Sequence, residues 1–350
     1  MQTEPFYYAQ NNQKFICKSL EEALEKGLDK ESHIFIYGII KFPEVENYAK
    51  ENGMTIYRIE DAFIRSVALG SGFSKPYSLS IDSRGIYFDP RKPSDLEHLL
   101  ENHQFSDELL QRAKKVREEV LASKFSKYNH LEHKEIEIDR TQYDKVILVT
   151  GQVADDMSMK FGAFGLTYTD LLQMVRKNNP KSYIIYKPHP DVLSGNRQGH
   201  IPKKITNACA NEIQTDISID SCIAVSDEIH TLTSGAGFDA LLRGKTVFTY
   251  GMPFYAGWGL TTDYRKCERR TRKLSLDELI ASTLILFPRY ISPKTGAFCE
   301  IEQTLQELKE EQERYFNDRL YRYRVNLKGY LLPRTRRTVR AILKPFKLEI

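Results

Sequence analysis

The chain is poor in cysteine and has no long apolar run. Its five cysteines are widely scattered, and no two of them form a C-x-x-C pair: Cys17, Cys209, Cys222, Cys267 and Cys299. This pattern indicates neither a disulfide framework nor a zinc site. No run of 18 apolar residues occurs, and residues 1–10 are polar and aromatic, unlike a signal peptide. We therefore expect a cytoplasmic protein with reduced thiols.

The length and the hydrophobic pattern predict two domains. With 350 residues, of which 41% are hydrophobic, the chain is longer than a domain with a single hydrophobic core usually is. Short β-rich apolar runs alternate with amphipathic helical stretches, which is typical of parallel sheets covered by helices. The expected strands cover residues 34–37, 55–59, 145–150, 183–186, 229–233 and 246–250.

We predict an α/β fold of two Rossmann-like domains that face each other across a cleft. The polar stretch at residues 125–140 has no sustained apolar period and is interpreted as the linker between them. The first, acceptor-side domain with this linker would cover residues 1–140. The second, donor-binding domain would cover 141–300, and a C-terminal helix with a basic tail would cover 301–350.

The positive charge is concentrated at the C-terminus. Residues 319–350 carry ten Lys or Arg against one Glu, and aromatic and aliphatic residues lie between these cations. Such a segment suits an anionic lipid surface, so we expect a peripheral position on the inner membrane. A solvated tail that folds back on the first domain is the alternative. Nucleic acid is not expected, because no recognisable nucleic-acid-binding motif accompanies the tail.

Acidic residues follow the first expected strand of the second domain. The sequence GQVADDMS after residues 145–150 places Gln152, Asp155 and Asp156 at the carboxyl end of that strand. Open α/β sheets bind ligands at this end, and a carboxylate there can act as a nucleophile or a base. Alternatively, one of the two aspartates only caps the following helix.

Two further strand ends carry groups that suit a phosphate. Residues 183–186 lead into KPHPD, where two prolines hold Lys187 and His189 at the strand tip. Residues 229–233 lead into a small-residue helix start, which offers Thr233, Ser234 and Gly235. An inert surface loop and a structural glycine turn are the respective alternatives.

Aromatic residues and a second acidic group complete the set of candidates. The loop at residues 251–263 contains Tyr255 and the only tryptophan, Trp258, whose rings suit stacking on a sugar or a base. A well-packed loop is the competing interpretation. In the first half, Glu60 and Asp61 follow a strand, and Arg65 can bind a carboxylate in bidentate fashion. Asp61 and Arg65, four residues apart, can equally pair on one helical turn.

Taken together, these motifs resemble the bacterial KpsC-type capsule β-Kdo transferases. The resemblance extends over residues 33–300 and includes FSKYN and GQVADDMS in addition to the motifs around Lys187 and Ser234. It continues through EDAFIRSVALGSGFSKPYSLSIDSRGIYFDP at 60–90 and FPRYISPKTG at 287–296. Typical members hold two transferase modules, whereas this chain resembles one, nearer to the second.

The resemblance implies a metal-independent, retaining glycosyltransferase of the GT-B type, without a cofactor, that uses CMP-β-Kdo as its donor. It assigns the nucleophile of the Q-x-x-x-D motif to Asp156. Lys187, His189, Ser234 and Gly235 would lie on the CMP side. The implied acceptor is a Kdo-terminated glycolipid or glycan in capsule biosynthesis or in another Kdo-containing surface polysaccharide.

We expect a double displacement in which Asp156 attacks the anomeric carbon of Kdo and CMP leaves. Lys187, His189 and the helix start near Ser234 would stabilise the departing phosphate. Glu60 or Asp61 would deprotonate the acceptor hydroxyl. The alternatives are another CMP-sugar transferase, similar to sialyltransferases, and a non-catalytic scaffold for capsule assembly at the membrane.

Overall fold

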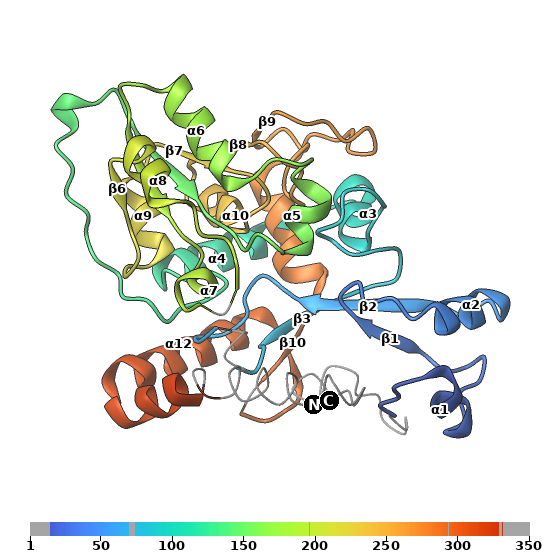
Figure 1. Ribbon diagram of the computed structural model, residues 1–350. Coiled ribbons are helices and arrows are strands. Elements are labelled where there is room, and N and C mark those ends of the chain that lie inside the picture. Colours follow the sequence, from blue (N-terminus) through green and yellow to red (C-terminus); the bar gives the residue numbers. More distant parts are fainter. Residues whose placement is uncertain (1–14, 70–73, 196, 293, 329–330, 332–350) are drawn as a thin grey trace, which may run out of the picture.

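The computed structural model describes residues 15–69, 74–195, 197–292, 294–328 and 331. Its strands form two sheets, each in its own lobe (Figure 1). The first sheet has the strand order β1-β2-β3-β10-β11, and the second has the order β6-β5-β4-β7-β8-β9. The predicted α/β class is therefore confirmed.

The second sheet is parallel at every described pairing. Its central strand has the sequence VILVT and is buried along its whole length, as expected for a strand covered on both faces. The strands are β4 (Val146–Thr150), β5 (Tyr183–Lys187), β6 (Glu212–Ile213), β7 (Glu228–Thr231), β8 (Thr246–Thr249) and β9 (Thr262–Asp263).

Alternate residues of β4 belong to two different hydrophobic clusters. Ile147 and Val149 pack with α6, whereas Val146 and Leu148 pack with α9 and α10. The helices of this lobe are α5 (Met157–Gly162), α6 (Tyr168–Asn178), α7 (Pro190–Leu193), α8 (Lys203–Cys209), α9 (Ile219–Val225) and α10 (Ala236–Leu242). The carboxyl ends of β4, β5 and β7 therefore open on one edge of a fully covered sheet.

The first sheet is mixed, because only β1 and β2 run parallel and the other pairs are antiparallel. Its strands are β1 (Ile34–Tyr37), β2 (Ile56–Asp61), β3 (Ser78–Asp82), β10 (Pro288–Ile291) and β11 (Phe298–Cys299). Helices α1 (Leu20–Glu25) and α2 (Pro43–Glu51) lie beside β1 and β2.

The last strands of the first sheet come from the far end of the sequence. Strands β10 and β11 lie within the range 141–300, yet Pro288 pairs with Ser80 of β3. The chain therefore returns to the first sheet after it has built the second. The division at residues 140 and 300 stays a prediction, and this return is a feature that it did not include.

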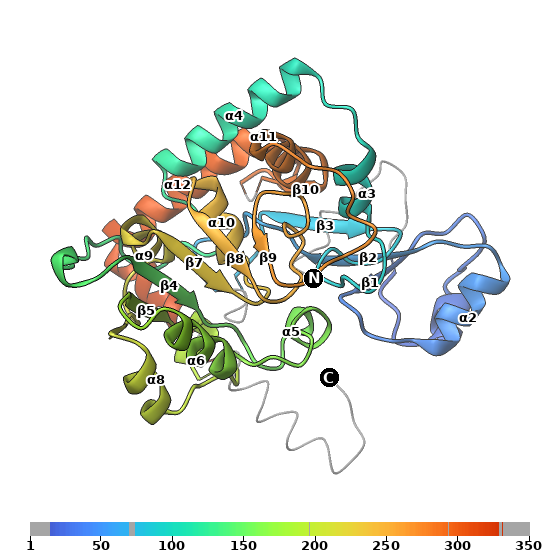
Figure 2. The ribbon, with the colours of Figure 1, turned by 90° about the horizontal axis from the view of Figure 1, so that it is seen from above.

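Several helices join the two lobes. Helix α4 contacts α11, the π-helix that follows it, and α12, and Figure 2 shows these elements side by side. Their side chains share one hydrophobic cluster with both lobes. The helices are α3 (Asp95–Asn102), α4 (Asp107–Ala122), α11 (Leu276–Ile280), the π-helix Ala281–Leu286 and α12 (Ile301–Asn317).

The C-terminal helix that was expected within residues 301–350 is interrupted. Helix α12 ends at Asn317, and Asp318 has an extended backbone with φ −99° and ψ 101°. Its carboxylate accepts hydrogen bonds from the backbone N–H groups of Leu320 and Tyr321, which starts a new helix over residues 319–328. The rest of the predicted basic tail, except Leu331, lies outside the described residues.

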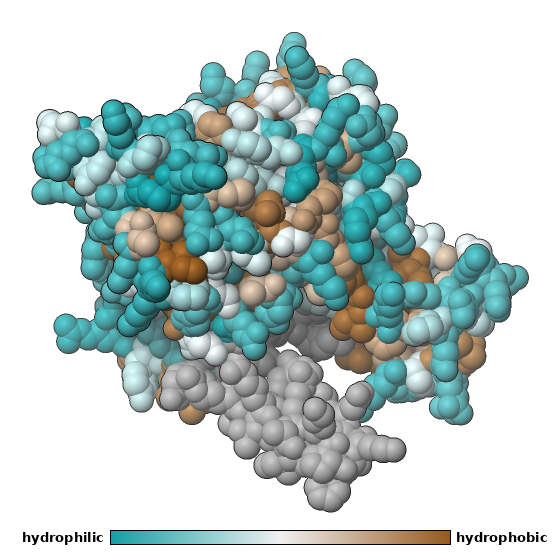
Figure 3. Space-filling model, turned by 45° about the horizontal axis from the view of Figure 1, so that its top comes forward, coloured by the Kyte–Doolittle hydropathy of each residue, from teal (hydrophilic) through white to brown (hydrophobic). Residues whose placement is uncertain are grey.

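On the face that Figure 3 shows, hydrophilic side chains predominate, and apolar side chains appear as patches among them. Among the described residues, no helix is both long enough and apolar enough to cross a membrane.

Candidate functional site

A cavity of about 140 Å³ opens where β4, β5 and β7 end. It brings together four of the predicted residues, Lys187, His189, Ser234 and Gly235, together with Phe63 of the first lobe. The remaining wall comes from the chain between the lobes and from the starts of α9 and α10. Ligand binding at this edge of the sheet follows the general rule for open α/β folds.

Lys187 is the last residue of β5 and is almost fully buried. Its Nζ donates to the carbonyl oxygens of Gln214, at 3.3 Å, and Thr215, at 3.5 Å. Burial lowers the pKa of its ammonium group, because the charged form loses hydration. An anion that reaches the cavity would supply the missing counter-charge.

His189 caps the short helix α7. Its Nδ1 accepts the backbone N–H of Asp191 at 3.1 Å, so this nitrogen carries no proton in the capped state. Burial lowers the pKa of the imidazole, while the Asp191 and Asp156 carboxylates oppose that change. The other ring nitrogen, Nε2, is therefore the one that can donate a hydrogen bond to a ligand.

Ser234 and Gly235 stand at the start of α10. Ser234 Oγ accepts the N–H of Ala236 at 3.3 Å, and its own N–H donates to Thr231 at 3.3 Å. A Cβ on Gly235 would meet nothing within 4 Å, so this exposed glycine leaves open space at the helix start. Both interpretations of the motif, a ligand approach and a structural turn, fit this geometry.

Asp156 caps α5, with its Oδ1 accepting the N–H of Ser158 at 3.0 Å. The capping interpretation is therefore realised, and the carboxylate remains half-buried. Its neighbour Asp155 is exposed and pairs with Arg197 at 3.1 Å. Capping uses one carboxylate oxygen and does not exclude a chemical role for Asp156.

Gln152 lies in a buried hydrogen-bond network that connects to Asp156 through Ser158. Its Oε1 accepts from Tyr168, at 2.9 Å, and from Thr233, at 3.0 Å. These two bonds fix the amide so that its Nε2 donates to Ser158 at 2.6 Å. Gln152 and Thr233 are thus in contact with each other, and neither is among the residues that line the cavity.

The acidic residues of the first lobe have different surroundings. Asp61 pairs with Arg65 at 2.5 Å and accepts the Tyr37 hydroxyl at 3.1 Å. Arg65 also donates to Ser66 at 2.9 Å, so its guanidinium is engaged within the lobe. Asp61 and Arg65 therefore form the predicted ion pair, but not on a helical turn, because Asp61 ends β2 and residues 62–65 are not helical.

Glu60 is a strongly perturbed carboxyl group. Burial, together with the negative charges of Asp61 and Asp156, raises its pKa to about 7, while the Lys127 charge and a hydrogen bond from the Asp61 backbone oppose the rise. Since Asp156 belongs to the other lobe, this electrostatic coupling spans the gap between the lobes. A carboxyl group that titrates near neutrality is suited to general base catalysis.

The two aromatic residues of the 251–263 loop belong to the core. Tyr255 and Trp258 are fully buried, and neither is among the cavity-lining residues. Tyr255 donates its hydroxyl to Ser234 O at 2.6 Å, and Trp258 donates to Phe254 O at 2.9 Å. The expected stacking on a sugar or base is wrong for this structure, because helix α10 covers Tyr255 so closely that a Cβ on Gly237 would meet its ring.

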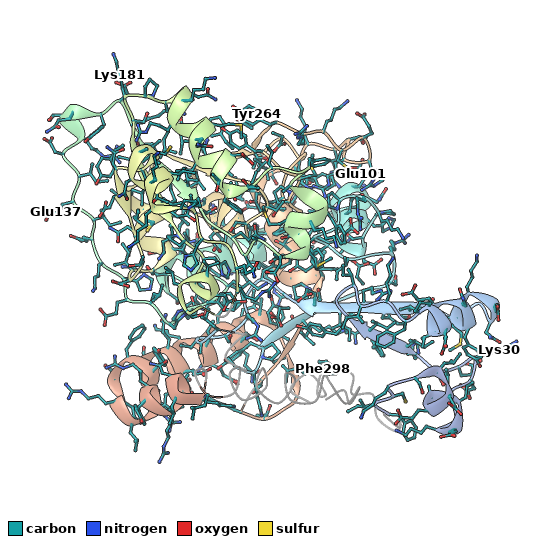
Figure 4. The ribbon with its side chains drawn as sticks, viewed as in Figure 1. Lys30, Glu101, Glu137, Lys181, Tyr264 and Phe298 are labelled. Atoms are coloured by element: carbon teal, nitrogen blue, oxygen red, sulfur yellow. The ribbon has the colours of Figure 1, made fainter. Side chains whose placement is uncertain are left out.

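The chain between the lobes lines the cavity, which the sequence analysis did not predict. Residues 125–131, which we call the crossing segment, line the cavity through Ser126, Lys127, Tyr128, His130 and Leu131. The motif FSKYN was part of the resemblance, but its polar sequence was interpreted as a linker. Only afterwards does the chain move away, and Glu137 lies at the outer edge of the second lobe (Figure 4).

His130 adds an unsatisfied group to the cavity. Its Nδ1 is buried and has no hydrogen-bond partner among the described residues. Burial lowers the pKa of the imidazole to about 4, and the nearby Lys187 charge acts in the same direction. His130 is therefore neutral at pH 7.

Asp239 of α10 is another cavity-lining residue that the sequence analysis did not predict. Burial raises the pKa of its carboxyl group to about 7.

No group of three or more His, Cys, Asp or Glu side chains in the described part of the chain is arranged to hold a metal ion. The prediction of a metal-independent enzyme without a cofactor stays a prediction.

Comparison with known proteins identifies the relatives of this chain. Residues 43–290 match the family model described as capsule polysaccharide biosynthesis protein. The capsule polysaccharide modification protein LipA of Neisseria meningitidis serogroup A is 42% identical over 306 residues, which cover 87% of this chain and 43% of LipA. The lipopolysaccharide-processing protein LpsZ of Rhizobium meliloti is 39% identical over 276 residues, which cover 78% of this chain and 62% of LpsZ. The chain thus spans less than two thirds of the length of these relatives.

Two solved structures share the fold. The β-Kdo 2,4 transferase of Thermosulfurimonas dismutans KpsC matches with a TM-score of 0.71 at 32% identity, covering 79% of this chain and 86% of that one. The β-Kdo 2,7 transferase of the same KpsC matches with a TM-score of 0.68 at 37% identity, covering 85% and 91%. These likenesses confirm the predicted GT-B-type fold and the resemblance to KpsC-type proteins. The chain belongs to the family of capsule polysaccharide biosynthesis proteins.

Proposed function

We propose that this chain is a retaining β-Kdo transferase, which moves Kdo from CMP-β-Kdo to a Kdo-terminated glycolipid or glycan in capsule or related surface polysaccharide biosynthesis. The similarity to two Kdo transferases supports the proposal. The observation that carries it is the cavity at the ends of β4, β5 and β7, which is lined by Lys187, His189 and Ser234. Asp156 and Glu60 are not among its lining residues, but their carboxylates influence each other across the two lobes.

The proposed reaction is a double displacement. The Asp156 carboxylate attacks the anomeric carbon of Kdo, the bond from that carbon to the phosphate oxygen breaks, and CMP leaves. An acceptor hydroxyl then attacks the same carbon, Glu60 takes its proton, and the bond to Asp156 breaks. Two inversions give net retention.

We assign the acceptor base to Glu60 in preference to Asp61. Asp61 is held in an ion pair with Arg65, which keeps that carboxylate engaged. Glu60, with a pKa near 7, can both accept and release a proton at neutral pH. Lys187 and the Nε2–H of His189 would balance the negative charge that develops on the leaving phosphate, without a metal ion.

The test is incubation of the purified protein with CMP-Kdo and synthetic Kdo-terminated acceptors, followed by assignment of the new bond by NMR. The bond type distinguishes a 2,4 from a 2,7 linkage, and an excess of EDTA tests the metal-independent part of the proposal. Consumption of CMP-sialic acid in place of CMP-Kdo would identify a sialyltransferase-like enzyme instead.

Asp156→Asn tests the nucleophile, because asparagine retains the cap of α5 but cannot form the covalent intermediate. We expect transfer to fall by about three orders of magnitude or more while CMP binding stays within about twofold. Asp155→Asn is the matched control, since Asp155 is exposed and points to Arg197. Near-normal turnover of the Asp156 variant would remove that residue from the role.

We also propose that the basic C-terminal region places the enzyme on the anionic inner-membrane surface. In the helix over residues 319–328, Tyr321 and Val325 pack against the core, whereas Leu320, Tyr323 and Leu327 are exposed at helical spacing. Arginines flank this exposed stripe, which suits an interfacial position. A non-catalytic scaffold would show the same lipid binding without consumption of CMP-Kdo.

A further inference from the structure

The crossing segment holds Lys127 in a defined place on the cavity wall. Asn129 fixes the turn on both sides, because its side chain accepts the N–H of Ser126 at 2.9 Å and donates to Ser66 O at 3.2 Å. Its backbone N–H donates to Val67 O at 2.9 Å. Lys127 is therefore presented to the cavity by backbone that is anchored on the first lobe.

Lys127 forms no ion pair within the part of the chain that the structure describes. Its ammonium group makes no hydrogen bond or ion pair with any described residue, although it lines the cavity. The other cations nearby are engaged. Arg65 pairs with Asp61, Arg243 pairs with Asp220 at 2.6 Å, and Lys187 donates to two carbonyl oxygens.

The charge of Lys127 affects the pKa values of three groups, which lie on three different parts of the chain. It lies close enough to Glu60 of β2 and Asp239 of α10 to favour their ionised forms, and close enough to His189 to disfavour its protonation. From the wall of the cavity, Lys127 thus influences groups of both lobes. The phosphate-binding candidates Lys187, His189 and Ser234 belong to the second lobe alone.

We propose that Lys127 binds the carboxylate of the sugar acid that is transferred. This inference rests on the proposed function. In a 2-keto sugar acid, the carboxylate is bonded directly to the anomeric carbon. It must therefore come close to the attacking Asp156 carboxylate and to Glu60, where three negative charges would repel one another. A cation at this point offsets the repulsion and orients the anomeric carbon.

The experiment compares Lys127→Met and Lys127→Arg with the unmodified protein. We expect Lys127→Met to raise the KM for CMP-Kdo by roughly 10- to 100-fold, the range for loss of a charge-assisted contact. Lys127→Arg should recover part of the loss because it restores the charge. Affinity for CMP, which lacks the sugar carboxylate, should change by less than about twofold.

A matched control and the unfolding temperature separate binding from folding. Lys134→Met alters an exposed lysine that follows the crossing segment and pairs with Glu132 at 3.5 Å, so it should leave both constants unchanged. The thermal midpoint of Lys127→Met should stay close to that of the unmodified protein, since no ion pair is lost and only the longer-range attraction to Glu60 and Asp239 disappears.

The outcomes are distinguishable. A parallel loss of CMP affinity would make Lys127 a phosphate ligand and overturn the inference, as would an unchanged KM for the donor. A rise confined to the KM for the acceptor would assign Lys127 to an acceptor carboxylate and also overturn it. If the unmodified protein transfers no Kdo, the proposed function fails, and the inference fails with it.

Discussion

Gln152 reaches Asp156 through the hydroxyl of Ser158. Gln152 Nε2 donates to Ser158 Oγ at 2.6 Å, and Ser158 Oγ donates to Asp156 Oδ1 at 3.1 Å. Because Tyr168 and Thr233 already donate to the Gln152 carbonyl oxygen, the amide orientation and the direction of the chain are fixed. Gln152 is thus a positioning residue for the proposed nucleophile.

Ser158→Ala removes the middle link of this chain. We expect kcat to fall by about tenfold, because Asp156 keeps its backbone cap but loses one orienting bond. The measured CMP affinity should stay unchanged, since Ser158 does not line the cavity. An equal loss of CMP affinity and kcat would show that the network supports the whole second lobe.

The activity should depend on the ionisation of Glu60. A general base works only when deprotonated, so kcat should decline as the pH falls below about 7, where burial and the neighbouring carboxylates place the Glu60 pKa. Glu60→Gln should lower kcat and flatten this part of the pH profile. A profile that keeps its shape in the variant would assign the titration to another group.

The raised pKa of Glu60 also predicts how the stability of the fold depends on pH. The folded-state pKa of Glu60 lies above the ordinary value of 4.5, so its ionisation opposes folding as the pH rises from about 4.5 to about 7. Glu60→Gln removes this penalty. The change in unfolding free energy that the substitution causes should therefore be more favourable at pH 8 than at pH 4.5, by about 1–3 kcal/mol. Urea unfolding at the two pH values measures the difference.

His130 should produce the opposite pH dependence. Its folded-state pKa is lowered to about 4, so the unfolded chain gains a proton first as the pH falls below about 6.5. The stability conferred by neutral His130 is present above pH 6.5 and is lost progressively between about pH 6.5 and 4. His130→Gln should reduce this acid loss in urea titrations. An identical loss in the variant would place the acid sensitivity elsewhere.

Trp258 should behave as a core residue. Because its ring is fully buried and away from the cavity, Trp258→Ala should cost about 3–5 kcal/mol of unfolding free energy. Trp258→Phe should cost less and retain CMP affinity in calorimetry. A selective loss of donor affinity in the folded Phe variant would restore the stacking interpretation.

Local patterns made much of the second lobe predictable. The buried run VILVT indicated a covered parallel strand, and the structure places it at the centre of the second sheet. Lys187 and Ser234 were found because one ends such a strand and the other closely follows one, and the carboxyl ends of parallel strands lie on one edge of the sheet.

Features that depend on distant parts of the chain were not predictable in this way. The pairing of Pro288 with Ser80 joins strands about two hundred residues apart in sequence, and no local pattern encodes it. The burial of Tyr255 depends on Gly237 opposite its ring. Lys127 and His130 were missed because a polar stretch has the same composition whether it faces solvent or lines a cavity.

The late return of the chain to its first sheet determines how the protein can be divided. A fragment that ends at residue 140 would lack β10 and β11 and would leave β3 as an unprotected edge. Exposed edges of this kind recruit other chains, so such a fragment would aggregate on expression. The amino-terminal lobe can therefore complete its sheet only after synthesis has passed residue 299, where β11 ends.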